Sequence, residues 1–146
     1  MDLWGDIMKQ ELVKNNITII IPSLSPDTKL ITLVNELINV GFKKIVVIND
    51  GSEKEYDKFF DEVESLGCSL CVHAQNKGKG QALKTAFKYV KDNISNCLGV
   101  ITVDGDGQHM VRDILRCGEA MLENTDKLVL GCRTFNSKDI PLRRAE

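Results

Sequence analysis

The sequence has no long hydrophobic run and no large excess of charge of one sign. Its longest aliphatic stretch, Ile19-Ile20-Ile21 with its neighbours, is far shorter than the roughly 20 apolar residues of a membrane-spanning helix. Nineteen basic residues against 21 acidic ones give a net charge of -2, so no basic field can hold nucleic acid or an anionic membrane non-specifically. We therefore expect no transmembrane segment and no nucleic-acid partner, and any anionic ligand must be bound by local contacts.

The sequence also lacks a secretory signal and a disulfide framework. Residues 1–16 contain neither the basic segment nor the apolar core of a signal peptide, which predicts a cytoplasmic protein. The five cysteines are odd in number and irregularly spaced, as in a chain of reduced thiols. Cys68 and Cys71 match a CxxC pattern, but they belong to a strand-like run in which residues three apart point to opposite faces. A shared metal or redox site at this pair is therefore not expected.

Residues 1–16 are predicted to form an N-terminal leader with one short amphipathic helix. Its apolar residues recur at helical spacing, and they are Trp4, Ile7, Met8, Leu12 and Val13. Apolar helical stripes usually face a core, so this pattern favours a flap packed on the domain over a membrane anchor.

From residue 17 to residue 146, short apolar runs alternate with longer helical patterns, which is typical of βαβ units around a parallel sheet. Strands are predicted at 17–21, 44–48, 69–73, 98–103 and 127–130. Helices are predicted at 27–40, 53–66, 80–93 and 111–123, the first capped by Asp27 and ended by Gly41. This order predicts an α/β fold of three layers, with helices on both faces of a mainly parallel sheet.

Ligands of open parallel sheets bind beyond the carboxyl ends of the strands, so the residues that follow each predicted strand matter most. In chain order these segments are Pro22-Ser23, Asn49-Asp50-Gly51-Ser52, Gln75-Asn76-Lys77-Gly78, Asp104-Gly105-Asp106-Gly107-Gln108-His109 and Gly131-Cys132-Arg133.

The acidic pair Asp104 and Asp106 directly follows a buried strand. A divalent cation would best relieve the repulsion between the two carboxylates, and oxygen ligands suit Mg²⁺ or Mn²⁺, which proteins often share with substrate phosphates. Gln108 offers a further oxygen. The alternative is a tight acidic turn without metal. An EF-hand is excluded because Leu115 stands where that loop needs glutamate, and zinc at His109 lacks nearby ligands.

Two other strand-end segments admit two interpretations each. Asp50 could accept a bond from a nucleobase N–H or a ribose hydroxyl, or the segment could be a plain turn in which Ser52 caps a helix that begins at Glu53. The segment 76–80 does not match a Walker loop. Its two lysines at a helix N-terminus could attract a diphosphate, or it could be a solvated turn.

Taken in order, the segments IIIPS, NDGS, NKGKGQALKTA, DGDGQH and GCR resemble the family 2 glycosyltransferases, in particular dolichyl-phosphate mannose synthase-like enzymes and bacterial polyprenyl-phosphate sugar transferases. The resemblance spans about residues 17–144. It implies a GT-A (Rossmann-like) fold, in which residues 17–146 are the nucleotide-sugar-binding part. It also implies that the chain is truncated before the acceptor side of the domain.

The resemblance further implies a donor site for a UDP- or GDP-linked sugar. The implied donor-binding residues are Pro22, Ser23 and Asp50 at the base, Lys77 and Gly78 along the nucleoside, and Asp104 near the ribose. The implied ligands of Mg²⁺ or Mn²⁺ are Asp104, Asp106 and Gln108. Asp106 and Arg133 are the implied catalytic residues, the first through the cation and the second through phosphate oxygens.

The implied reaction is an inverting displacement at the anomeric carbon, with a polyprenyl phosphate or a saccharide as acceptor. A lipid acceptor would place the protein at the inner face of the membrane. The chain departs from the family at Leu24-Ser25-Pro26-Asp27, where an aromatic residue and an Asn-Glu pair are usual, and this leaves the base open. The alternatives are a sugar-nucleotide pyrophosphorylase, which the absence of a glycine-rich loop after the first strand disfavours, and a non-catalytic nucleotide-binding remnant. An open sheet edge would allow a homodimer.

Overall fold

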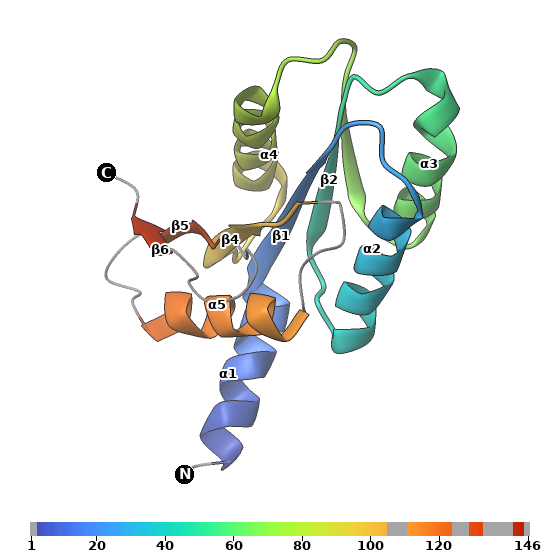
Figure 1. Ribbon diagram of the computed structural model, residues 1–146. Coiled ribbons are helices and arrows are strands. Elements are labelled where there is room, and N and C mark those ends of the chain that lie inside the picture. The colour runs from blue at the N-terminus through green and yellow to red at the C-terminus, as the bar shows by residue number, and fades with distance from the viewer. Residues whose placement is uncertain (1–2, 105–110, 124–128, 133–141, 145–146) are drawn as a thin grey trace.

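The computed structural model describes residues 3–104, 111–123, 129–132 and 142–144 (Figure 1). The elements in chain order are α1 (Leu3–Asn16), β1 (Ile17–Ser23), α2 (Thr28–Val40), β2 (Ile45–Asp50), the 3₁₀ helix η1 (Lys54–Tyr56), α3 (Asp57–Ser65), β3 (Ser69–His73), α4 (Lys79–Asn93), β4 (Gly99–Thr102), α5 (Val111–Glu123), β5 (Val129–Cys132) and β6 (Leu142–Arg144). No helix in these ranges is long and apolar enough to cross a membrane.

Four parallel strands form the central sheet in the order β3-β2-β1-β4. The register of β1 against β2 pairs Ile19 with Ile45 and Ser23 with Asn49. Because the strands are parallel, their carboxyl ends meet at one edge of the sheet, and the described residues that follow β1, β2, β3 and β4 lie at that edge (Figure 1). The predicted α/β class with a mainly parallel sheet is confirmed.

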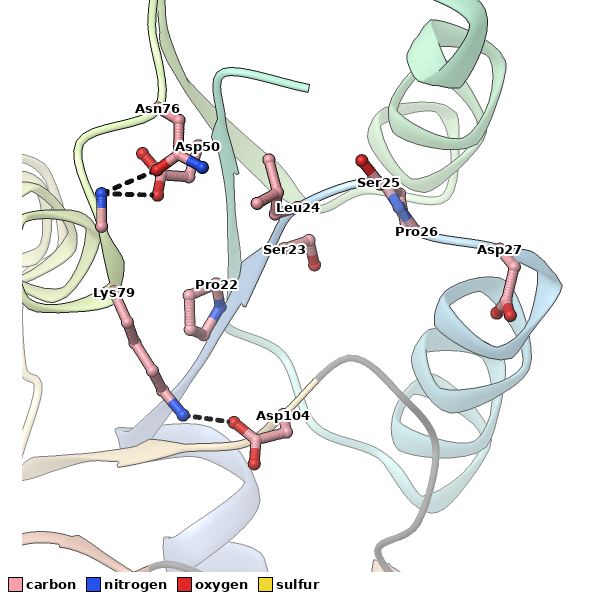
Figure 2. A pocket seen from close by; sticks show the side chains of 11 residues that line it. Pro22, Ser23, Leu24, Ser25, Pro26, Asp27, Asp50, Asn76, Lys79 and Asp104 are labelled. Atoms are coloured by element: carbon pink, nitrogen blue, oxygen red, sulfur yellow. Dashed lines mark hydrogen bonds and ion pairs between the residues drawn. The ribbon is translucent and has the colours of Figure 1, made fainter. Parts of the chain in front are cut away.

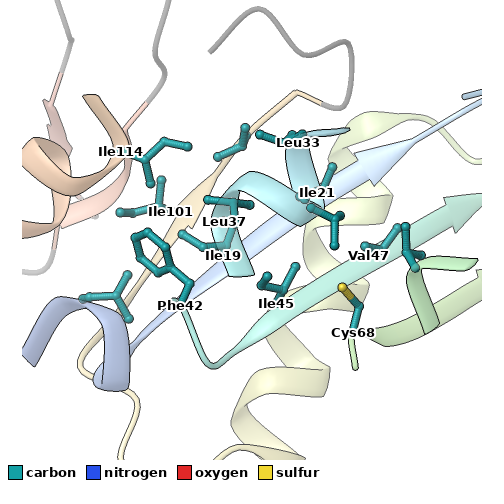
Figure 3. Packing of buried hydrophobic residues seen from close by; sticks show 14 of the residues in the cluster. Ile19, Ile21, Leu33, Leu37, Phe42, Ile45, Val47, Cys68, Ile101 and Ile114 are labelled. Carbon is teal, nitrogen blue, oxygen red and sulfur yellow. The ribbon is translucent and has the colours of Figure 1, made fainter. Parts of the chain in front are cut away.

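The sheet is buried on both faces, which explains why its strands are continuous apolar runs. Alternate residues of β1 serve different cores: Ile19 and Ile21 pack with α2, α3 and α5, whereas Ile20 packs with α4. Figure 3 shows the larger core, in which Phe42 and Ile114 pack near Ile101. The helices therefore lie in two layers with the sheet between them, as in the predicted three-layer arrangement.

Local capping signals fix the ends of α2. The Asp27 carboxylate accepts a bond of 2.8 Å from the Lys29 N–H, as an N-cap residue does. Gly41 ends the helix with φ +115°, a left-handed conformation that favours glycine. Both boundary residues were correctly predicted from the sequence.

Two predicted elements differ from the structure. The helix predicted at 53–66 is divided into η1 and α3, and Glu53 at the N-cap of η1 makes no side-chain capping bond. The fifth strand, β5, does not join the parallel sheet but pairs antiparallel with β6. The sequence indicated a strand here but not its antiparallel partner β6, because an apolar run does not by itself determine its partner strand.

The leader helix α1 packs on α5 through its last turns. Val13 is fully buried, and a Cβ at Gly118 of α5 would overlap its side chain, so glycine allows the two helices to approach closely. Lys9 Nζ lies 2.9 Å from Glu123 Oε1.

Only Val13 of the predicted apolar stripe is buried. The side chains of Trp4, Ile7, Met8 and Leu12 are exposed, so the prediction that the stripe packs on the domain is wrong for these four. Val13 follows Trp4 by nine residues, which is about two and a half helical turns and places the two on opposite sides of α1.

Three described cysteines follow the sequence prediction, and Cys117 does not. Cys68 belongs to the core on one face of the sheet and Cys71 packs against the core on the other, so the pair cannot share a metal. Burial raises the pKa of the Cys68 thiol to about 11, which disfavours the thiolate that metals and redox chemistry need. Cys68, Cys71 and Cys97 are free, whereas Cys117 is disulfide-bonded, which corrects the expectation of reduced thiols throughout.

Candidate functional site

A pocket of about 410 Å³ lies at the carboxyl ends of β1, β2 and β4, beside the N-terminus of α4 (Figure 2). Its size is in the range of small-molecule sites. The residues that line it are Pro22, Ser23, Leu24, Ser25, Pro26, Asp27, Asp50, Asn76, Gly78, Lys79 and Asp104. Four strand-end segments, those at the ends of β1, β2, β3 and β4, and the start of α4 therefore meet around this pocket.

The segment 49–52 after β2 ties together the loops that follow β1 and β3. Asn49 Oδ1 accepts a bond of 2.9 Å from the Ser52 N–H, which closes the turn. Ser52 Oγ accepts a bond of 2.9 Å from the Ser25 N–H and so holds the loop after β1. Ser52 therefore joins two loops, and the alternative in which it caps a helix is wrong.

Asp50 is the buried centre of this arrangement. Its Oδ1 accepts the N–H of Lys77 at 2.9 Å, and its Oδ2 accepts the N–H of Gly78 at 3.0 Å. His73 Nδ1 lies 2.8 Å from Asp50 Oδ1, and His73 Nε2 lies 2.8 Å from Thr85 Oγ1 on α4. An ionised carboxylate only accepts, so His73 donates to it. These bonds connect β2, β3, the loop after β3 and α4.

The charge of Asp50 is stabilised despite its burial. Burial alone raises the pKa of its carboxyl, but the bonds from the Lys77 N–H, His73 and the Gly78 N–H outweigh that effect and hold the pKa below its ordinary value. A carboxylate has about four acceptor positions, of which the protein uses three. Asp50 also lines the pocket, and its Oδ2 accepts one bond, from the Gly78 N–H.

Glycine is required at position 51 because the loops after β2 and β3 approach each other closely there. Its φ is +78°, and a Cβ at this position would overlap the backbone of Gln75 and Asn76. Any other residue would be strained and would push the loop after β3 away from the pocket. The glycine of the NDGS segment therefore sets the distance between the two loops.

The loop after β1 contains one strained residue and one buried hydroxyl without a partner. Ser25 has φ +52°, which is uncommon for a residue other than glycine, and Ser52 holds it in place. Ser23 is 7% exposed, and its Oγ has no hydrogen-bond partner within the part of the chain that the structure describes. Because Ser23 lines the pocket, this hydroxyl is available to a ligand.

Lys79, the first residue of α4, reaches across the pocket to the end of β4. Its Nζ lies 2.6 Å from Asp104 Oδ1 (Figure 2), and the two side chains are 41% and 42% exposed. The cationic partner of Asp104 in the pocket is therefore the Lys79 ammonium.

The sequence profile of glycosyl transferase family 2 matches residues 18–145, which is most of the chain. The chain belongs to glycosyl transferase family 2. The resemblance stated from the sequence is therefore correct at the level of the family.

Three curated proteins are similar to this family 2 chain. An uncharacterized protein of Methanocaldococcus jannaschii is 29% identical, over 89% of the chain and 51% of the relative. The UDP-N-acetylglucosamine–dolichyl-phosphate N-acetylglucosaminyltransferase of Methanococcus voltae is 27% identical, over 84% of the chain and 54% of that enzyme. A second uncharacterized protein of M. jannaschii is 26% identical. The chain spans about half the length of these relatives, and no solved structure matches it significantly.

The structure brings together most of the residues that were predicted to bind the sugar donor. Pro22, Ser23, Asp50, Gly78 and Asp104 all line the pocket. Lys77 contributes its backbone N–H to Asp50, while the lysine side chain that reaches across the pocket is that of Lys79. Asp106, Gln108 and Arg133 lie outside the described residues.

Only part of the predicted cation site can be described. No group of three His, Cys, Asp or Glu residues that could hold a metal occurs in the ranges that the structure covers. Asp104 is the one predicted ligand within those ranges. Its carboxylate fits the role because it is half-exposed to the pocket and already accepts a cationic group, the Lys79 ammonium.

Two residues that shape the site, His73 and Thr85, were not singled out from the sequence. Lys79 was considered as one of two lysines that could attract a diphosphate, and Ser52 as a helix cap, but their contacts with Asp104 and Ser25 were not predicted. His73 ends a predicted strand, and Lys79 directly precedes a predicted helix, so their positions at this edge of the sheet were the available signal.

Proposed function

We propose that this family 2 protein transfers a sugar, with inversion, from a UDP- or GDP-linked donor to a polyprenyl phosphate or a saccharide. The pocket at the carboxyl ends of β1, β2 and β4 is the proposed nucleotide site, and the proposed acceptor site lies outside it. Membership of family 2 favours this activity over that of a sugar-nucleotide pyrophosphorylase.

One observation carries the proposal: of the six predicted donor residues within the described ranges, five line a single pocket with a preformed wall. That wall is fixed by Asp50, Gly51 and Ser52, so it requires little ordering when a ligand binds. Preorganised polar groups reduce the entropic cost of binding.

The proposed base-binding residues are Pro22, Ser23 and Asp50. The unpartnered Ser23 hydroxyl can bond a base oxygen or nitrogen, and the remaining acceptor position of Asp50 can take a base N–H. Lys77 and Gly78 are proposed to lie along the nucleoside because Asp50 holds their backbone at the edge of the pocket.

The proposed catalytic contribution is electrostatic. Asp104, Asp106 and Gln108 are proposed to hold Mg²⁺ or Mn²⁺, which would supply positive charge to the leaving diphosphate. Asp106 is thus a proposed catalytic residue through the cation, and Arg133 is proposed to contact phosphate oxygens as the second one. A polyprenyl phosphate acceptor is already an anion, so no general base is needed for it.

The acceptor and the cellular location of the protein are also proposals. The M. voltae relative is named for a dolichyl-phosphate acceptor, which supports a lipid-linked phosphate and a place in the cytoplasm at the inner face of the membrane. A homodimer through an outer strand of the central sheet is a further proposal. Size-exclusion chromatography with light scattering measures the mass of the protein in solution. A mass of one chain at every concentration would contradict the homodimer.

Calorimetric titration tests the proposed donor site. The chain is titrated with UDP- and GDP-linked sugars, each with and without Mn²⁺, and with a nucleoside monophosphate as control. We expect one base to bind more tightly than the other, and Mn²⁺ to strengthen binding of the diphosphate but not of the monophosphate. If none of these ligands binds under any condition, the proposal is wrong.

A further inference from the structure

The ion pair between Lys79 and Asp104 joins two elements that are far apart in the sequence. Lys79 begins α4 and Asp104 directly follows β4, and their side chains meet at 2.6 Å on the wall of the pocket. Figure 2 shows the lysine extended along the pocket toward the carboxylate. No other described lysine pairs with Asp104 at this distance.

A lysine ammonium and a divalent cation are alternative partners for one carboxylate oxygen. Both are cations attracted by the single negative charge of Asp104, so an ammonium at Oδ1 weakens the attraction of this carboxylate for a divalent cation. The pair is about 40% exposed on each side, and an exposed ion pair biases an equilibrium by roughly five-fold or less. The ammonium can therefore neutralise Asp104 and still leave easily.

The released lysine would remain over the pocket. It is anchored at the N-terminus of α4, beside Gly78, whose N–H is held by Asp50 and Asn76. From that anchor an ammonium that leaves Asp104 can turn to another anion in the same pocket. A diphosphate is such an anion, and lysine is a common phosphate ligand.

We propose that Lys79 is an exchangeable cation of the donor site: it pairs with Asp104 while the site is empty, and moves to the donor's diphosphate when a divalent cation takes Asp104. This inference rests on the proposed function, because it uses the same pocket and the same cation. It adds a residue that couples cation binding to diphosphate binding.

The proposal predicts two effects of opposite sign for Lys79→Gln. Without nucleotide, loss of the competing ammonium should tighten Mn²⁺ binding by roughly 2- to 5-fold. With Mn²⁺ present, loss of the phosphate ligand should weaken UDP or GDP binding by about ten-fold. A merely structural lysine would change both affinities in the same direction, or neither.

The experiment measures free Mn²⁺ by electron paramagnetic resonance and nucleotide binding by calorimetry, on the whole chain. Lys79→Arg keeps the positive charge and should show smaller changes than Lys79→Gln in both affinities. Lys88→Gln, an exposed lysine on the same helix, is the matched control and should bind like the unmodified chain. Equal thermal midpoints would show that each variant is folded.

Two outcomes separate the failure of this inference from that of the proposed function. If the unmodified chain binds neither Mn²⁺ nor nucleotide, the proposed function is wrong, and the proposed role of Lys79 is then wrong as well. If the unmodified chain binds both, but Lys79→Gln leaves Mn²⁺ affinity unchanged or lowers it, only the exchange is wrong.

Discussion

His73 Nδ1 and Asp50 Oδ1 lie 2.8 Å apart in the interior of the protein, and both side chains are more than nine-tenths buried. This bond links the carboxyl ends of two adjacent parallel strands. The same carboxylate holds the backbone of Lys77 and Gly78, so one buried charge fixes both the strand ends and the loop that follows them. The shape of the pocket therefore depends on Asp50.

Asp50→Asn should lower the free energy of unfolding by about 2–4 kcal/mol at pH 7, because an amide cannot accept all three bonds and leaves buried donors unpaired. Chemical denaturation of the two proteins measures the difference. Asp92→Asn, an exposed change on α4, is the control and should alter stability by less than about 0.5 kcal/mol. Equal stability losses in the two variants would contradict a special role of Asp50.

The Asp50 carboxylate should also make stability depend on pH in one direction. Its pKa in the folded protein lies below its ordinary value of 3.8, so the folded state holds this proton less tightly than the unfolded state. The stabilisation is therefore complete above pH 3.8 and is lost as the pH falls below 3.8 and through the folded-state pKa.

Unfolding free energies of the unmodified chain and Asp50→Asn, measured from pH 7 to pH 3, test this dependence. The difference between the two proteins should be constant at neutral pH and should shrink at the acidic end. A difference that grows as the pH falls would show that the sign is wrong.

Gly51→Ala should be much more costly than Gly67→Ala, although both glycines have positive φ. Gly67 has open space around its Cβ position, so alanine there should cost only the left-handed strain, about 1 kcal/mol. At Gly51 the Cβ would also overlap the backbone of Asn76, which raises the expected cost to about 2–4 kcal/mol.

The two glycine variants also separate the site from general stability. Gly51→Ala should weaken nucleotide binding because it displaces the loop after β3, whereas Gly67→Ala should not. Denaturation and calorimetry on both variants provide the comparison. Equal costs would contradict the close approach of the two loops.

Ser23→Ala should separate stability from binding. The Ser23 hydroxyl is buried without a partner in the described part of the chain, so its removal should leave stability unchanged or raise it by up to about 1 kcal/mol. If the hydroxyl contacts the base, nucleotide affinity should fall by roughly 5- to 10-fold. Ser65→Ala on α3 should leave nucleotide affinity unchanged. Unaltered nucleotide binding by Ser23→Ala would remove this residue from the proposed site.

The sequence predicted the elements whose signals are local. The strand at 69–73 was predicted at its observed bounds, and Asp27 and Gly41 marked the ends of α2, because apolar runs, caps and left-handed glycines act within a few residues. Strand ends also indicated the pocket, since parallel strands bring their carboxyl ends to one edge.

The remaining features depend on contacts between distant segments. Ser52 bonds Ser25 instead of capping a helix, and Lys79 reaches Asp104, and neither pairing has a local pattern. The same holds for α1, where Val13 alone finds a partner on α5 and Trp4 stays exposed. Spacing shows that a helix has an apolar stripe, but the position of its neighbours decides which side is buried.

The most direct test of the central claim is a calorimetric comparison of the unmodified chain with Asp104→Asn. Each is titrated with UDP and GDP, with and without Mn²⁺. In the unmodified chain Mn²⁺ should strengthen binding of the preferred nucleotide by about ten-fold or more, and in Asp104→Asn this gain should largely disappear. If Mn²⁺ strengthens binding equally in both proteins, or if neither protein binds a nucleotide, the pocket is not a cation-dependent donor site.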